Sequence, residues 1–461
     1  MRSNRKILLS LVVAVSFLYF GVSYLIVGQE RLSILKSFLT QSQKNFLLTY
    51  AFPYYKISQL EKKITVLEDR ISILQEQRYA VEIDAKASNK PVEVLSDVVK
   101  LSDGETLTLY RLANGFYNGI KNYYPGSGFL DFHQNNLVLV SARGLLAYSG
   151  IREGDFYFRQ IKNNINDFIG IKQFKKNRWF SIKDLSVMED KIFLSYTKEI
   201  RENCWNIAVL QGVMSYERII FEDMFSPKDC IPSADGGHFE GRESGGRIAH
   251  LDEEHMILSV GEFGKGHLSQ DESGVNGKLI TVSIKDGSHK VLSLGHRNPQ
   301  GLYFDADNNF FLETEHGPQG GDEINLVDMS GVDNTVRPNY GWPIASYGEH
   351  YGGRVDSNRD NYAKEPLYKS HAQYGFVEPI KYFVPSIGIS QIARVAENKY
   401  VVGSMRDQSL YFFGVNKEGK IRDLRRVHVG ERIRDLVTKS NKLYLFLEDS
   451  ASIGVISLAG D

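Results

Sequence analysis

The 461-residue sequence has little cysteine, little proline and no excess of either charge. The two cysteines, Cys204 and Cys230, are too few for a small disulfide scaffold, and no neighbouring ligands complete a zinc site around them. Outside the cytoplasm an isolated pair can form one disulfide, which we expect in preference to two free thiols.

The formal net charge is -1, with 55 Lys and Arg residues against 56 Asp and Glu residues. Nucleic-acid-binding domains usually carry a basic surplus, so the composition gives no support for a nucleic-acid partner. The chain is instead rich in glycine (41), tyrosine (25) and phenylalanine (26), with only 12 prolines. This balance is typical of repeated β-hairpins rather than of a disordered chain.

One long hydrophobic run lies near the start of the chain. Residues 7–27 contain no charged side chain, and a helix of this length, at ~1.5 Å per residue, crosses a ~30 Å hydrocarbon core. A cleavable signal peptide would have a shorter apolar region and a small-x-small exit. Arg2, Arg5 and Lys6 precede the run, so the positive-inside rule makes residues 1–6 a cytoplasmic tip. We therefore expect a single-pass anchor in a bacterial inner membrane, with the remaining chain in the periplasm.

A stalk is predicted after the anchor, with an amphipathic juxtamembrane helix over 28–56 and a coiled coil over 57–80. Its heptad positions a and d are occupied by Ile57, Leu60, Ile64, Leu67, Ile71 and Leu74. Ile at a with Leu at d favours a parallel two-stranded coiled coil, which predicts a homodimer. The alternative is a single amphipathic helix packed on the globular domain.

The pattern changes to strands from about residue 100 to residue 461. Short apolar runs with partial alternation are separated by turn residues, and few helical patterns interrupt them. Strand pairs recurring over this length predict an all-β fold, most simply a β-propeller of six to eight four-stranded blades. A large sandwich or a β-helix would also fit the strand spacing alone.

Several stretches are more polar and richer in glycine than ordinary turns are. They cover residues 236–248, 295–302, 314–326, 339–353, 404–408 and 430–436. Among their residues, Arg297, Arg406, Arg432 and Arg434 carry guanidinium groups, which bind carboxylates or phosphates bidentately. The 314–326 stretch combines carboxylates with Gly-rich turns, a combination that suits calcium. Together these groups predict a site for a planar polyanion.

The motifs GHRNPQGL, TEHGPQGGDEINL and NYGWPIASYG, in this order and spacing, resemble the pyrroloquinoline-quinone (PQQ)-dependent aldose sugar dehydrogenases of the glucose/sorbosone dehydrogenase family. The resemblance covers residues 230–440 well and residues 100–230 only as a general strand pattern. It implies a six-bladed propeller that binds PQQ and Ca²⁺ and oxidises an aldose at the anomeric carbon to the lactone. Electrons would then pass to an acceptor in the respiratory chain.

The resemblance also implies roles for individual residues. Its cofactor contacts map onto Arg297, Asn298, Tyr351, Arg406, Arg432 and Arg434. Arg406 stands where the family usually has Lys. Backbone carbonyls of Gly317 and Pro318 match the calcium site at the cofactor, and Glu323 and Tyr340 match a second, structural calcium. The charge of Arg297 would stabilise the reduced cofactor, which makes this residue catalytic as well.

Two residues compete for the role of catalytic base. The family uses a His in a His-x-x-Gly-Arg segment, and His238 fits this form with Gly241 and Arg242. Alignment on the GGRI end instead places Glu243 there, with Glu262 in the position that orients the base. A His titrates near neutrality, at ~6.5, and a Glu near the cofactor's carboxylates would have a raised pKa. Both residues stay open as the base.

Two further functions are compatible with the same architecture. A propeller that has lost the base would act as an extracytoplasmic carbohydrate- or protein-binding module. A lactonase-type hydrolase would need a central calcium held by several carboxylates, whereas the residues expected there are cationic.

Overall fold

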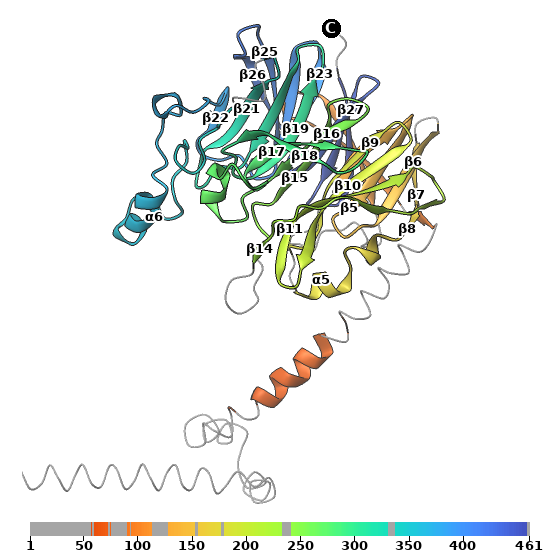
Figure 1. Ribbon diagram of the computed structural model, residues 1–461. Helices are drawn as coiled ribbons and strands as arrows, with labels where there is room; N and C mark the ends of the chain where they lie inside the picture. The colour runs from red at the N-terminus through yellow and green to blue at the C-terminus, as the bar shows by residue number, and fades with distance from the viewer. Residues whose placement is uncertain are drawn as a thin grey trace, which may run out of the picture. The chain divides into compact units, whose positions relative to one another are not determined.

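The computed structural model describes residues 57, 60–71, 74, 90–92, 94–112, 128–152, 155–176, 179–232, 241–330 and 337–458 (Figure 1). The chain divides into two compact units, residues 1–81 and 82–461. The predicted cytoplasmic tip, membrane anchor and juxtamembrane helix lie outside the described residues. Within the described part, no helix is both long and apolar enough to span a membrane.

The described residues of the predicted coiled coil are helical. Their a and d side chains are about half exposed, from 48% at Leu60 to 57% at Leu67. The described helix therefore carries a half-exposed apolar stripe along its a and d positions.

The second unit is a six-bladed β-propeller. Each blade is an antiparallel sheet whose strands follow one another from the centre outwards. Blade one comprises β4 (Gly128–His133), β5 (Asn136–Ser141), β6 (Leu146–Arg152) and β7 (Asp155–Gln160), with β1 (Pro91–Val92) at its edge. Blade two comprises β9 (Ile182–Met188), β10 (Lys191–Arg201), β11 (Cys204–Val213), β13 (Glu222–Phe225) and β14 (Ile231–Pro232). Blade three comprises β15 (Gly245–His250), β16 (His255–Val260), β17 (Lys278–Ser283) and β18 (His289–Leu294).

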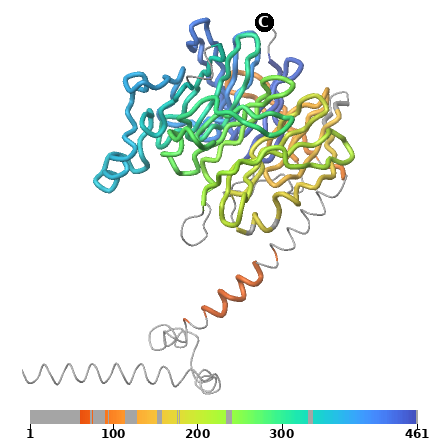
Figure 2. The backbone as a smooth tube through the Cα atoms, viewed as in Figure 1, coloured from red at the N-terminus to blue at the C-terminus, as the bar shows by residue number. Residues whose placement is uncertain are grey.

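The later blades repeat this order. Blade four comprises β19 (Pro299–Asp305), β20 (Phe310–Glu315), β21 (Asp322–Asp328) and β22 (Lys381–Phe383). Blade five comprises β23 (Ile389–Ala396), β24 (Lys399–Ser404), β25 (Ser409–Val415) and β26 (Ile421–His428). Blade six comprises β27 (Ile433–Lys439), β28 (Lys442–Leu447), β29 (Ser452–Ser457), β3 (Thr106–Leu112) and β2 (Val94–Lys100). The colour in Figure 2 passes from yellow through green to blue as the chain runs from one blade to the next.

Short elements lie outside the blades. They are the parallel pair β8 (Lys162–Asn163) and β12 (Arg218–Ile219), the helices α5 (Ile171–Lys176) and α6 (Arg359–Lys364), and the 3-10 turns η2 (Ile165–Asp167), η3 (Gly266–Gln270), η4 (Asp356–Asn358) and η5 (Ala372–Tyr374).

The innermost strand of every blade contacts the innermost strands of both neighbours. These strands are β4, β9, β15, β19, β23 and β27, and their contacts form a closed ring. The six-bladed propeller implied by the resemblance is thus confirmed, and the sandwich and β-helix alternatives are wrong. Strands β1 and β2 show that the body includes residues before residue 100.

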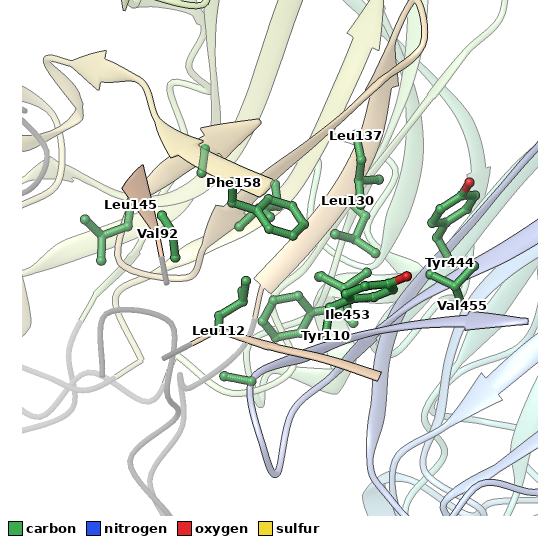
Figure 3. Packing of buried hydrophobic residues seen from close by; sticks show 14 residues of the cluster. Val92, Tyr110, Leu112, Leu130, Leu137, Leu145, Phe158, Tyr444, Ile453 and Val455 are labelled. Carbon is green, nitrogen blue, oxygen red and sulfur yellow. The ribbon is translucent and has the colours of Figure 1, made fainter. Parts of the chain in front are cut away.

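The ring is closed by a sheet made from both ends of the described chain. Strand β3 pairs with β29, so an early strand completes the blade that the last three strands begin. Figure 3 shows the cluster beside this closure, in which Tyr110 and Leu112 of β3 lie with Leu130 and Leu137 of blade one and Ile453 of β29. These side chains are buried, and burial stabilises the fold by about 1.5–3 kcal/mol for each large apolar side chain.

A buried ion cluster connects blades below the mouth of the ring. Arg247 of β15 donates from Nη1 to Asp184 of β9 and to Asp435 of β27, at 2.8 Å each. Its Nη2 donates to the carbonyl of Arg434 at 3.1 Å. The cluster therefore ties blades two, three and six together. Removal of Arg247 would leave buried carboxylates without their counter-charge, a change that typically costs about 3–5 kcal/mol.

Blade two carries the expected disulfide. Cys204 and Cys230 are bonded, with their Cα atoms 5.3 Å apart, and the described chain contains no free cysteine. The bond joins the start of β11 to the segment that leads into β14. It is consistent with an oxidising compartment.

Candidate active site

A pocket of about 400 Å³ lies where the innermost strands begin. Every blade contributes residues at or next to the start of its inner strand. They include Phe129 of β4, Lys183 of β9, Gly245 of β15, Gln300 of β19, Gly388 before β23 and Arg434 of β27. The pocket is therefore at the mouth of the central channel, where the loops of all six blades converge.

Most of the predicted site residues line this pocket. Those brought together there are Glu243, Arg297, Asn298, Gly317, Pro318, Tyr351, Arg406, Arg432 and Arg434. Glu323 and Tyr340 do not line it, because both are buried within blade four. His238 lies outside the described residues.

The polar side chains of the GHRNPQGL segment lie in two places, the interior of the blade and the pocket. Gly295 has a φ of +80°, and a Cβ there would lie 2.2 Å from Oδ1 of Asn339, so the turn requires glycine. His296 is fully buried inside the blade, whereas Arg297 and Asn298 line the pocket. Strand β19 begins immediately afterwards, at Pro299.

Arg297 is held by contacts on several sides. Its Nη1 donates to the carbonyls of His316 at 3.0 Å and Gly317 at 3.1 Å, and its Nη2 bonds Glu243. The guanidinium also lies over the Trp342 ring, 5.2 Å from its centroid. Its Nε is buried and has no hydrogen-bond partner among the described residues.

Glu243 and Glu262 form a pair of carboxyl groups beside Arg297. The backbone of Glu243 has a φ of +57°, and its carbonyl accepts a hydrogen bond from the Phe263 N–H at 2.9 Å. Burial, together with repulsion from the Glu243 carboxylate, raises the pKa of Glu262 well above its usual range, and the two side chains share a hydrogen bond. Two carboxyl groups in contact cannot both ionise easily, so the pair holds one proton. Glu243 is the more exposed member and lines the pocket.

Asn298 is oriented by its own strand and by blade three. Its Oδ1 accepts hydrogen bonds from the Gly245 N–H at 3.2 Å and from Nε2 of Gln300 at 3.0 Å. Nε2 of neighbouring His316 lies 2.7 Å from the carbonyl of Ile389, and burial lowers the pKa of this His. His316 is therefore a neutral donor at the wall of the pocket.

Arg432 and Arg434 lie two residues apart on and beside β27, and both line the pocket. The Glu448 carboxylate holds them side by side, at 2.9 Å from Nε of Arg432 and 2.9 Å from Nη2 of Arg434. Nη1 of Arg434 also donates to Oε1 of Gln300 at 3.2 Å. Such a fixed pair of guanidinium groups suits a ligand with adjacent carboxylates.

Lys183 is a pocket residue that the sequence did not single out. Its stem packs over Gly246, where a Cβ would lie 2.4 Å from the Lys183 Cβ. Within the described part of the chain, its amino group has no hydrogen-bond or ion-pair partner. Burial and the nearby Arg434 guanidinium lower the pKa of Lys183 to about 7. The SIKDLSV segment alternates polar and apolar residues like a solvated strand, and the only available signal was its position at the head of an inner strand.

The described pocket is strongly cationic. Its basic lining residues are Lys183, Arg242, Arg247, Arg297, Arg406, Arg432 and Arg434, against the acidic Glu243 and Asp322. Arg406 is exposed at the rim. The arrangement can bind a small polyanion and present one carboxylate base to a second ligand.

The Glucose / Sorbosone dehydrogenase family model matches residues 184–456, which is more than half of the chain. The chain belongs to this family. It is accordingly an oxidoreductase that acts on the CH–OH groups of sugars.

Individual relatives agree with this assignment. The chain is 28% identical to the aldose sugar dehydrogenase YliI of Escherichia coli over 284 residues, which cover 57% of this chain and 71% of that protein. The structure of the soluble Escherichia coli aldose sugar dehydrogenase in its apo form superposes with a TM-score of 0.58 at 21% identity, covering 79% of this chain and 99% of that one. The PQQ-bound aldose sugar dehydrogenase from Streptomyces coelicolor superposes with a TM-score of 0.54 at 18% identity, covering 80% and 98%. At these identities the two structures show a common fold.

Proposed function

We propose that the protein is a PQQ-dependent sugar dehydrogenase that oxidises an aldose at its anomeric carbon to the lactone. The observation that carries the proposal is the Glu243–Arg297 pair at the centre of a cationic pocket. Family membership and a structural neighbour in a PQQ-bound form support it.

The donor set of the pocket fits PQQ, a planar tricarboxylate. The paired guanidinium groups of Arg432 and Arg434 match adjacent carboxylates, and Arg406 and Lys183 supply further positive charge. Arg297 lines the same pocket and brings its positive charge to the place where the quinone would bind. A volume of about 400 Å³ lies in the range of small-cofactor sites.

When bound, the quinone supplies a two-electron acceptor that takes the hydride from the anomeric carbon. Glu243 takes the proton of the anomeric hydroxyl, so the sugar loses both hydrogens and becomes the lactone. Arg297 holds Glu243 in place through an ion pair, and Glu262, whose pKa is raised, shares a hydrogen bond with it. Arg297 also provides positive charge where negative charge develops on reduction.

His238 remains the alternative base, and two variants distinguish it from Glu243. If Glu243 is the base, Glu243→Gln should abolish most turnover at saturating PQQ while His238→Ala retains it. The reverse result would assign the role to His238. If both variants turn over sugar at the wild-type rate, neither residue is the base.

We further propose that the carbonyls of Gly317 and Pro318, which line the pocket, would hold a calcium ion, and that this ion would supply Lewis-acid polarisation of a bound quinone. The Gly317 turn is tight, because a Cβ there would lie 2.1 Å from the Gly321 carbonyl. The Gly317 carbonyl accepts from Arg297 and keeps a second lone pair for an ion. A second, structural calcium at Glu323 and Tyr340 remains part of the proposal.

The N-terminal segments bear on where the protein is located and how it assembles. We propose an inner-membrane anchor over 7–27, a periplasmic propeller, and a homodimer formed through the coiled coil. The half-exposed stripe from Ile57 to Leu74 supports the dimer, because a second copy of the same helix would cover it. Anchoring would place the site near an electron acceptor of the respiratory chain.

The test is calorimetric titration of PQQ into the full-length protein with calcium and then with a chelator, followed by sugar-dependent reduction of the bound cofactor. Tight, calcium-dependent binding and bleaching of the quinone absorbance by an aldose are expected. If a folded, calcium-loaded sample does not bind PQQ, the proposal is wrong and the alternative of a binding module takes its place.

A further inference from the structure

A second group of titratable side chains lies inside blade four, away from the pocket. It consists of His296, Glu313 and Glu315, and one ligand atom from each lies within 4.8 Å of the others. None of the three is more than 4% exposed. Their burial separates them from the pocket, whose lining includes none of them.

The sheet register explains how the carboxylates come together. Glu313 and Glu315 are two residues apart on β20, so both point to the same face of the blade. Their partners on β21 are Asn325 and Glu323, which face the same side. His296 approaches from the loop before β19, and its ring stacks on Tyr340 with centroids 4.8 Å apart. Four polar side chains of one sheet face and an imidazole therefore enclose a single space.

Several atoms of this group lack the partners that buried polar atoms normally have. Oε1 of Glu313, Nδ1 of His296 and Oδ1 of Asn325 are buried without a hydrogen-bond partner among the described residues. Nδ1 of His296 lies 3.4 Å from Oε1 of Glu315 and 3.9 Å from Oε2 of Glu313. Both separations exceed the usual 2.7–3.2 Å of an N–H···O bond. Two atoms that bind one ion at about 2.1 Å each lie about 3.0–3.4 Å apart, which matches the shorter separation.

The remaining contacts hold the ligands in position. Nδ2 of Asn325 donates to Glu313 Oε2 and Glu315 Oε1, both at 3.0 Å, and the Arg297 N–H donates to Glu315 Oε2 at 2.6 Å. Nε2 of His296 lies 2.8 Å from the Ser293 hydroxyl. Metal-binding imidazoles and carboxylates are commonly oriented by such outer hydrogen bonds.

The charge of the group also requires compensation. In the described part of the chain, the ion pairs of Glu313 and Glu315 involve only His296. Burial and repulsion from Glu315 raise the pKa of Glu313 well above its usual range. Buried carboxylates are stable when a cation neutralises them or when they stay protonated.

We propose that His296, Glu313 and Glu315 bind one divalent first-row transition metal ion, with Asn325 holding the two carboxylates through its Nδ2. One imidazole nitrogen among carboxylate and amide oxygens suits Mn²⁺, Fe²⁺, Co²⁺ or Zn²⁺, whereas Ca²⁺ takes oxygen ligands. The site goes beyond the proposed function and does not depend on it. Because His296 and Arg297 are adjacent and the Arg297 N–H bonds Glu315, the ion would fix the segment that carries Arg297.

The test is metal binding by the full-length protein after chelator treatment, measured by elemental analysis and by calorimetry with Mn²⁺, Zn²⁺ and Ca²⁺. We expect one tightly bound transition ion that raises the Tm. In Glu313→Gln the affinity should fall by more than about 100-fold, since even outer-shell changes cost about 10–100-fold. The increase in Tm on adding metal should also disappear in Glu313→Gln.

Asp305→Asn is the matched control, because Asp305 is a buried carboxylate of β19 in the same blade that accepts a hydrogen bond from the Tyr400 hydroxyl and does not belong to the group. It should keep the transition-metal site. With Co²⁺ as the probe, His296→Gln should alter the visible absorption spectrum, which gives a readout if Glu313→Gln does not fold. Binding that is equal in wild type and Glu313→Gln, or that is lost only in Asp305→Asn, would overturn the proposal, as would the absence of transition-metal binding by the wild type.

Discussion

The side of the pocket built by blades three to six differs from the side built by blade two. On the first side, each guanidinium of Arg297, Arg432 and Arg434 is fixed by a carboxylate. On the second side, Lys183 has an amino group without a partner in the described part of the chain. The first side is thus preorganised for one ligand geometry, whereas the second provides a charge that changes with pH.

We expect the largest effect from replacing Arg297, on the side of the pocket built by blades three to six. Arg297→Met removes the contacts to Glu243 and to the carbonyls of His316 and Gly317. Loss of a preorganised charge at the reacting centre should lower kcat by about 10³-fold or more. Steady-state turnover at saturating PQQ measures this. Arg425→Met, which removes an exposed arginine paired with Asp103, is the control and should keep wild-type turnover.

The second effect concerns the carboxyl pair. Glu243→Gln should lower kcat by about 10²–10³-fold, because the acceptor of the hydroxyl proton is lost. Glu262→Gln should cost less than about ten-fold, because Glu262 is already neutral through its raised pKa and Gln keeps its shape. Equal losses in the two variants would contradict the division of roles. The pH–rate profile of each variant is the measurement.

A third prediction concerns the affinity for the cofactor rather than kcat. Arg434→Met should weaken PQQ binding by about 10–100-fold, since one of two paired carboxylate contacts is lost. Calorimetry measures the change. The variant should also raise the pKa of Lys183, because the Arg434 charge lowers it in the wild type. Unchanged affinity would mean that the arginine pair does not contact the cofactor.

We expect the smallest effect from Lys183, on the side of the pocket built by blade two. Below pH 7 Lys183 is an ammonium group that attracts an anionic cofactor, and above its pKa of about 7 it is neutral. The Kd for PQQ should therefore rise about five-fold between about pH 6 and about pH 8, of the order of one partly exposed ion pair. Lys183→Met should bind more weakly at low pH and show a flat profile. A flat profile in the wild type would show that Lys183 does not contact the cofactor.

The difference between the two sides of the pocket also explains which site residues could be predicted from the sequence. Arg297, Asn298, Arg432 and Arg434 lie in distinctive motifs, and the period of two on a strand correctly places Arg432 and Arg434 on one side. Lys183 and Glu448 occur in ordinary alternating or turn segments. Their positions depend on how separate blades pack, which local patterns do not encode. GHRNPQGL was predicted to be functional, yet only the packing of the loop before β19 against β20 shows that His296 lies beside the carboxylates of Glu313 and Glu315.

Some features of the fold could likewise be predicted from the sequence, and others could not. Recurring strand pairs predicted the radial repeat, because each pair is local in sequence. The completion of blade six by β3 was not predictable, because β3 and β29 are separated by nearly the whole propeller. Hydrophobic alternation marks both as strands without identifying their partners.

The completion of blade six also has a consequence for synthesis. Strand β3 leaves the ribosome long before its partner β29, because five whole blades lie between them in the sequence. Until β29 is made, β3 has only its hairpin partner β2, and its other edge has no strand to pair with. Loss of the final strand would therefore leave the ring open and an early edge strand exposed, a form prone to aggregation and to capture by chaperones. The closing blade thus makes synthesis through β29 a condition for a stable propeller.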